Sequence, residues 1–178
     1  LAQRSFAVPL FPAIQHDGPV NSVDLSRDGH WVVTASQDGS ARVCDALTGQ
    51  PVGIPLRHGG PVHSARFSFD GRKVVTASAD MTARLWDAHT GEPLSSPLPH
   101  RSSVNAADFS PDGKAVVTAG GDPVEGGDTT ARLWDVAAGG LLIECAGGTF
   151  WTEPVPGTEK IRMVASNRLI HGKLPLPK

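Results

Sequence analysis

The sequence contains little cysteine and no concentration of charge of either sign. Its two cysteines, Cys44 and Cys145, are far apart and belong to no Cys-x-x-Cys or Cys/His ligand spacing, which excludes a disulfide framework and a zinc site of known spacing. Lysine and arginine number 16 and aspartate and glutamate 18, so the formal net charge is −2, and neither sign forms a block. A nucleic-acid or acidic-membrane partner is therefore not expected.

Long apolar runs and catalytic motifs are also missing. No stretch approaches the roughly 18 apolar residues that a membrane span requires. The chain has no Gly-x-Ser-x-Gly elbow, His-Glu-x-x-His motif, phosphate-binding loop, dinucleotide-binding glycine motif or kinase signature. We therefore expect no catalytic residues, no cofactor and no membrane association within these residues.

One pattern, in contrast, occurs three times. The histidines His16, His58 and His100 lie 42 residues apart, and three Asp-Gly pairs, beginning at Asp28, Asp70 and Asp112, keep the same interval. A period of about 40–45 residues is the length of one four-stranded propeller blade, and such a unit needs neighbours to cover its sheet. The sequence therefore predicts an all-β fold of three blades. Because closed propellers use roughly four to eight blades, the ring is expected to be open or incomplete.

Each repeat divides into four short alternating strands separated by Asp-Gly or Thr-Gly turns. In the second copy we expect strands at 62–67, 73–78, 82–86 and 92–98. The corresponding strands are expected at 20–25, 31–36, 40–45 and 50–56 in the first copy, and at 104–109, 114–119, 130–134 and 140–145 in the third. The predicted division of the chain is an outer-strand remnant of a preceding blade at 1–14, blades at 15–56, 57–98 and 99–147, and a tail at 148–178.

The two ends of the chain lie outside this pattern. The chain begins with Leu1, which we interpret as an internal cut of a longer protein or as processing. In the tail, the apolar runs 160–165 and 168–174 predict a hairpin around Ser166-Asn167. This hairpin either forms half of a degenerate fourth blade or covers an edge.

The segment 74–91, Val-Val-Thr-Ala-Ser-Ala-Asp-Met-Thr-Ala-Arg-Leu-Trp-Asp-Ala-His-Thr-Gly, follows a Phe-Ser-Phe-Asp-Gly turn and the connector histidine His58. In this order and spacing it resembles the WD-repeat β-propeller family, and the likeness extends from residue 15 to about 147. The sequence of the repeats is also similar to that of multidomain bacterial proteins in which such propellers are joined to signalling domains such as kinases.

The resemblance implies a hydrogen-bonded tetrad of His, Ser, Asp and Trp in each blade. In the second copy these residues are His58, Ser78, Asp80 and Trp86. The first copy has His16, Ser36 and Asp38 but has Cys44 in place of the tryptophan. The third copy has His100 and Trp134, has Gly120 in place of the serine, and carries an inserted turn at 121–127, which leaves Asp122 or Asp128 as the acid. We expect the first and third blades to be less rigid than the second.

The recurrence of histidines and aspartates at equivalent positions favours an architectural role over catalysis or metal binding. The acidic turn from Gly120 to Asp128 brings three acidic residues together, and hard cations bind clustered oxygens. The turn nevertheless lacks the alternating acidic spacing of a dedicated calcium loop, so no metal site is predicted. These acidic residues are Asp122, Glu125 and Asp128.

The expected function is therefore binding of a protein or peptide, without turnover. In the family that the chain resembles, partners contact the face that carries the connectors and the turns between strands two and three. Here the corresponding residues are Pro19, Asn21, Gln37, Pro61, His63, Ala79, Ser103, Asn105, Asp122, Glu125 and Asp128. The alternative is an accessory segment of a larger bacterial signalling enzyme, a kinase or protease, whose catalytic domain lies outside this chain. Self-association or additional blades would complete the ring, and the cytoplasm is the expected compartment.

Overall fold

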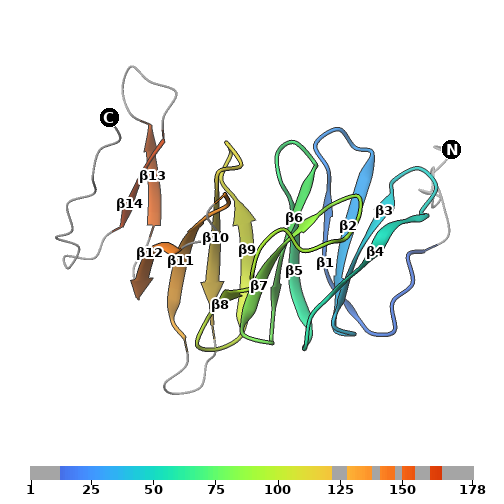
Figure 1. Ribbon diagram of the computed structural model, residues 1–178, viewed down its shortest axis with the longest axis horizontal. Coiled ribbons are helices and arrows are strands. Elements are labelled where there is room, and N and C mark those ends of the chain that lie inside the picture. Colours follow the sequence, from blue (N-terminus) through green and yellow to red (C-terminus); the bar gives the residue numbers. More distant parts are fainter. Residues whose placement is uncertain (1–12, 122–127, 138–140, 147–149, 155–160, 166–178) are drawn as a thin grey trace, which may run out of the picture.

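The computed structural model describes residues 13–121, 128–137, 141–146, 150–154 and 161–165. This part of the chain is entirely β-structure and contains no helix, hence none long and apolar enough to traverse a bilayer. Three antiparallel four-stranded sheets stand side by side along the long axis of the molecule (Figure 1). These three blades do not close into a ring within the described residues.

Every blade runs in sequence order from its first strand to its fourth. The strands of the first blade are β1 (Val20–Leu25), β2 (Trp31–Ser36), β3 (Ser40–Asp45) and β4 (Pro51–Arg57). Those of the second are β5 (Val62–Phe67), β6 (Lys73–Ser78), β7 (Thr82–Asp87) and β8 (Leu98–Pro99). Those of the third are β9 (Val104–Phe109), β10 (Ala115–Gly120), β11 (Thr130–Asp135) and β12 (Leu141–Ala146).

One of the strand predictions is wrong. The fourth strand of the second blade is only β8, Leu98–Pro99, because the segment before it contains Pro93 and Pro97, which cannot donate to a ladder. In the tail, β14 (Ile161–Ala165) pairs with β13 (Phe150–Pro154), the strand before it in the chain, whereas the hairpin turn predicted around Ser166-Asn167 falls on residues that the structure does not describe. The second strand expected at 168–174 lies outside the described residues.

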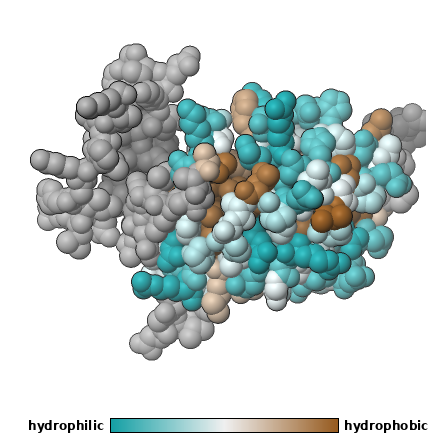
Figure 2. All heavy atoms as spheres, in the orientation of Figure 1, coloured by the Kyte–Doolittle hydropathy of each residue, from teal (hydrophilic) through white to brown (hydrophobic). Residues whose placement is uncertain are grey.

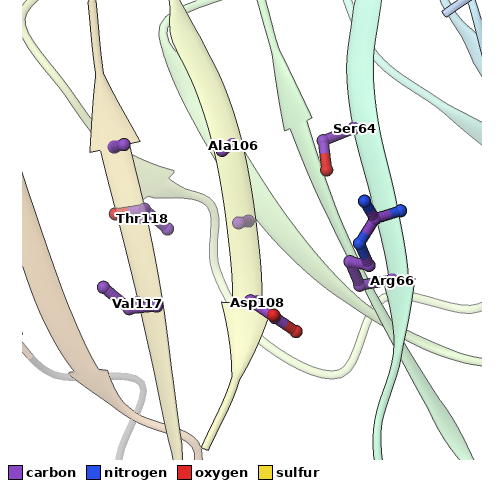
Figure 3. A pocket seen from close by; sticks show the side chains of 8 residues that line it. Ser64, Arg66, Ala106, Asp108, Val117 and Thr118 are labelled. Carbon is purple, nitrogen blue, oxygen red and sulfur yellow. The ribbon is translucent and has the colours of Figure 1, made fainter. Parts of the chain in front are cut away.

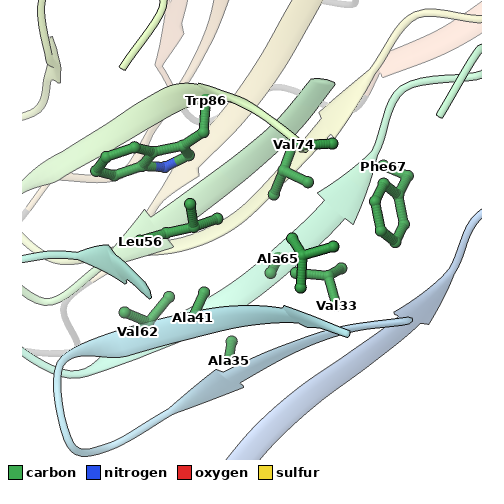
Figure 4. Packing of buried hydrophobic residues seen from close by; sticks show 11 residues of the cluster. Val33, Ala35, Ala41, Leu56, Val62, Ala65, Phe67, Val74 and Trp86 are labelled. Atoms are coloured by element: carbon green, nitrogen blue, oxygen red, sulfur yellow. The ribbon is translucent and has the colours of Figure 1, made fainter. Parts of the chain in front are cut away.

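The hydrophobic core lies between the blades and not within any one of them. One apolar cluster joins the first and second blades, where Val33, Ala41 and Leu56 face Val62 and Trp86 (Figure 4). A second cluster joins the other face of the second blade to the third. The second blade is therefore apolar on both faces because it is covered on both faces, as alternation along its strands requires.

The inner strands β1, β5 and β9 lie next to one another, so each blade packs on the next mainly through its first strand. The face of the described residues seen in Figure 2 is largely hydrophilic, but apolar areas interrupt it, one of them over the first blade. The exposed apolar side chains of β1 are Val20, Val23 and Leu25.

Candidate functional site

A buried histidine stands at the entry to the second blade and joins three elements. The His58 side chain is 0% exposed. Its Nδ1 lies 2.9 Å from Asp80 Oδ2, and its Nε2 lies 2.7 Å from Thr76 Oγ1. The indole N–H of Trp86 donates to the same Thr76 oxygen at 2.8 Å. The connector, β6, the following turn and β7 are thus joined by one chain of hydrogen bonds.

The donors and acceptors of this set are matched. A carboxylate only accepts, so the Nδ1–H of His58 donates to Asp80 and leaves Nε2 as an acceptor. The Thr76 hydroxyl then donates to Nε2, and its oxygen accepts from Trp86, whose indole can only donate. Each buried polar group in the set has a partner, which removes the cost of burying it.

The predicted role of Ser78 is wrong, because the hydroxyl of the tetrad belongs to Thr76. Trp86 lies in β7 opposite Val74, next to the Thr76 pair, whereas Ser78 is at the far end of β6. Four residues of strand span about 13 Å, beyond the reach of the indole. Ser78 instead donates to the connector carbonyls of Gly60, at 3.1 Å, and Pro61, at 3.0 Å.

Asp80 collects more hydrogen bonds than any other member of the set. Its carboxylate accepts from the Gly59 N–H at 3.0 Å, from the Thr82 hydroxyl at 2.6 Å and from His58. Burial raises the pKa of Asp80, but the hydrogen bonds from Thr82, Gly59 and His58 outweigh it and lower the pKa to about 2. Burial lowers the pKa of His58, and the neighbouring Asp80 opposes that shift.

The third blade has a complete tetrad, contrary to the prediction. His100 contacts Asp128 at 3.0 Å and Thr118 at 2.7 Å, and the Trp134 indole donates to Thr118 at 2.8 Å. The acid is therefore Asp128, and Asp122 lies outside the described residues. Because the hydroxyl of this tetrad belongs to Thr118, glycine at position 120 does not deprive the tetrad of a hydroxyl. A Cβ there would lie 2.9 Å from His100 Nδ1 and 2.8 Å from Asp128 Cγ, so only glycine leaves room for this pair.

The first blade lacks one member only. His16 contacts Asp38 at 3.0 Å and Thr34 at 2.7 Å, and Ser36 donates to the Gly18 carbonyl, as Ser78 does to its own connector. Cys44 occupies the position of the tryptophan and is 1% exposed, and its burial raises the pKa of the thiol. The expectation of a weaker set therefore concerns this blade and not the third.

The family model of the WD domain, G-beta repeat, matches residues 10–45, 49–87 and 91–135, which together exceed half of the chain. The chain belongs to the WD-repeat family. No curated protein shows a significant similarity to it.

The WD repeats in this sequence are offset from the blades in space. The matched segment 49–87 includes β4 of the first blade and β5, β6 and β7 of the second. The second and third WD repeats thus each supply the outer strand of one blade and three strands of the next. This overlap ties neighbouring blades together through the chain itself.

The connectors and the turns between second and third strands lie at one end of the WD-repeat blades, which we call the connector face. Pro19, Gln37 and Pro61 are exposed on it, whereas Ala79 and Ser103 are half-buried. Asp128 is buried in its tetrad, so it is not part of this face. Glu125, like Asp122, lies outside the described residues.

The connector-face residues Asn21 and His63 reach the next blade instead of pointing freely into solvent. Asn21 Nδ2 donates to the Val62 carbonyl at 2.8 Å, and His63 Nε2 lies 3.2 Å from Ser103 Oγ. Asn105, the equivalent residue of the third blade, donates to Gly121 O of its own blade at 2.9 Å. Asn21 and His63 therefore fix how neighbouring WD repeats sit together.

Sequence reasoning missed Met81 on the same face. Its φ of 67° lies in the left-handed region, and the equivalent residue of the first repeat is Gly39, with φ 81°. Left-handed backbone is costly for a side chain other than glycine. Met81 is also 52% exposed, although it is apolar. The change from Gly39 in the first repeat to Met81 in the second was the sequence signal that could have identified this residue.

A hollow of about 200 Å³ lies on the inner side of the WD repeats, between β5 and the strands of the third blade (Figure 3). Arg66 and Asp108 contribute charged groups to it, and Ser64 and Thr118 contribute hydroxyl-bearing side chains. Arg66 Nη1 also donates to Ser22 Oγ of the first blade at 3.1 Å. In the described part of the chain, no group of three or more His, Cys, Asp or Glu residues is arranged to hold a metal ion.

Proposed function

We propose that this chain is a non-catalytic scaffold that captures a protein or peptide partner on its connector face. WD repeats generally serve as protein-interaction scaffolds. The finer proposal, that the partner contacts the connectors and the turns between second and third strands, rests on how this chain holds those segments.

The observation that carries the proposal is that the three connector histidines are buried and hydrogen-bonded. The imidazoles of His16, His58 and His100 are 0% exposed, and each is held between an aspartate and a threonine. A side chain in that position cannot attack a substrate in solution. It fixes the connector to the following turn, and a preorganised loop loses less entropy when it binds.

Met81 is the candidate anchor of the connector face. It is exposed and apolar, and it keeps a left-handed backbone at a cost that glycine would avoid. Strained residues that persist on an exposed turn are concentrated at functional sites. An apolar side chain among small polar neighbours suits a short peptide with one apolar contact residue.

Selection of a random peptide library displayed on phage tests the proposal. We expect enriched peptides to bind the unaltered chain and to lose most binding to Met81→Ser and Gln37→Ala. Phe69→Ser is the matched control, because Phe69 is 54% exposed but lies in the turn between first and second strands. Enriched peptides that bind both connector-face variants as well as the unaltered chain would refute the proposed site, as would equal loss with Phe69→Ser.

A further inference from the structure

The junction between the first two blades is held by two side chains that grip the main chain of the next blade. Asn21 Nδ2 donates to the Val62 carbonyl at 2.8 Å, and the Asp24 carboxylate accepts from the Phe67 N–H at 3.0 Å. Both main-chain groups belong to β5, and both side chains come from β1. An inner strand is thus clamped at its two ends by the inner strand before it.

The same pair of side chains recurs on the last described blade. Asn105 and Asp108 of β9 stand two repeat periods after Asn21 and Asp24. Both are exposed, and among the described residues neither reaches another blade. Asp108 accepts from the adjacent Phe109 N–H at 2.8 Å, and Asn105 donates within its own blade. The third blade therefore carries the side chains of the clamp, and in the described part of the chain they hold no neighbouring inner strand.

At the opposite end of the array, no residue that the structure describes clamps the inner strand β1. In β1, Val20 is 49% exposed, Val23 61% and Leu25 59%. The equivalent residues of β5 are 0%, 0% and 8% exposed, because the first blade covers them. The uncovered residues are therefore apolar at the positions that become buried when one blade packs on another.

We propose that two copies of this chain associate head to tail, with β9 of one copy clamping β1 of the other. Asn105 would donate to the Val20 carbonyl, and Asp108 would accept from the Leu25 N–H, repeating the junction already present between the first and second blades. The occupant is a second copy because the same chain carries both halves of the junction. Two copies bring six blades, within the roughly four to eight that closed propellers use. The interface is heterologous, since the two copies contribute different faces.

Solution mass measured by sedimentation over a range of concentrations tests the proposal. The unaltered chain should form dimers or larger assemblies as its concentration rises. Val23→Glu places a charge in the exposed apolar face of β1, and Asp108→Lys removes the acceptor of the clamp on β9. Each variant alone should therefore be monomeric. Leu47→Glu is the matched control, since Leu47 is 74% exposed in the turn between β3 and β4 and should leave association unchanged.

An equimolar mixture of Val23→Glu and Asp108→Lys gives the decisive measurement. Each variant keeps the face that the other has lost, so one intact junction should form and the mixture should recover a dimer. An interface between two identical faces would leave one of the two variants associating on its own, which would overturn the head-to-tail arrangement. An unaltered chain that stays monomeric throughout, as it would if its own tail covered either face, would overturn the proposal altogether.

Discussion

Replacing Thr76 by valine keeps the volume and β-branching of the side chain but removes the hydroxyl on which the second tetrad converges. His58 Nε2 and the Trp86 N–H, at 2.7 and 2.8 Å from that oxygen, would both be left buried without this partner. Each buried polar group left unsatisfied costs about 1–3 kcal/mol, so Thr76→Val should lower the free energy of unfolding by about 2–6 kcal/mol.

The same substitution in the first blade provides an internal comparison. Thr34→Val leaves only the imidazole of His16 without its hydroxyl partner, because Cys44 supplies no indole. Its cost should be about 1–3 kcal/mol, less than that of Thr76→Val. Thr118→Val, in the complete third tetrad, should match Thr76→Val. Urea denaturation followed by circular dichroism measures all three.

A double-mutant cycle identifies the partner of the indole. Trp86→Phe combined with Thr76→Val should give a coupling free energy of about 1–2 kcal/mol, because the two changes remove the two ends of one hydrogen bond. Trp86→Phe combined with Ser78→Ala should be additive to within about 0.5 kcal/mol. Coupling to Ser78 instead of Thr76, or equal costs for Thr34→Val and Thr76→Val, would refute this account of the tetrads.

Three further predictions concern backbone strain and pH. Met81→Gly should stabilise the chain by about 1 kcal/mol, seen as a higher melting temperature, because glycine adopts φ 67° without penalty; an unchanged or lower melting temperature would contradict the strain. Gly91→Ala should destabilise more than Gly113→Ala in the same assay, since both have positive φ but only at Gly91 would the new Cβ collide with a main-chain carbonyl of the neighbouring blade. Stability should fall with acidification in two windows: from pH 6.5 downward, because the unfolded state takes up the proton that buried His58 resists, and again from pH 3.8 to about 2 as Asp80 is protonated. Urea titrations at a series of pH values measure both slopes, and stability independent of pH from 7 to 5 in the unaltered chain would contradict the role given to His58.

Local signals sufficed for most of the strands. β1, β2, β3, β5, β6 and β9 begin and end at the predicted residues, because alternating side chains and Asp-Gly turns are read from neighbouring positions. The fourth strands were harder to predict. β8 is short because prolines precede it, and an outer strand with one free edge tolerates that loss.

The tetrads, like the strands, were predicted only in part from the sequence. A histidine and an aspartate recur at equivalent positions in each repeat, which predicted a structural role for them. In the second blade His58 Nδ1 lies 2.9 Å from Asp80 Oδ2. Residue spacing could not predict whether Thr76 or Ser78 contacts the indole, because both side chains lie on the same face of β6. Only the distance that the indole can reach distinguishes them. The third tetrad was misjudged for the same reason, and only the tertiary structure assigns the acid, because it places Asp128 Oδ2 3.0 Å from His100 Nδ1.

The sequence by itself determined the number of blades, the strands within them and the recurrence of buried polar groups, because these follow from a period and from alternation along the chain. Only the tertiary structure decided which hydroxyl meets the indole, that Asn21 and His63 bridge blades, and that Val23 is uncovered while Ala65 is buried. Equivalent positions in a repeat have the same local conformation, but their contacts depend on which neighbour is present, and that is a property of the assembled blades.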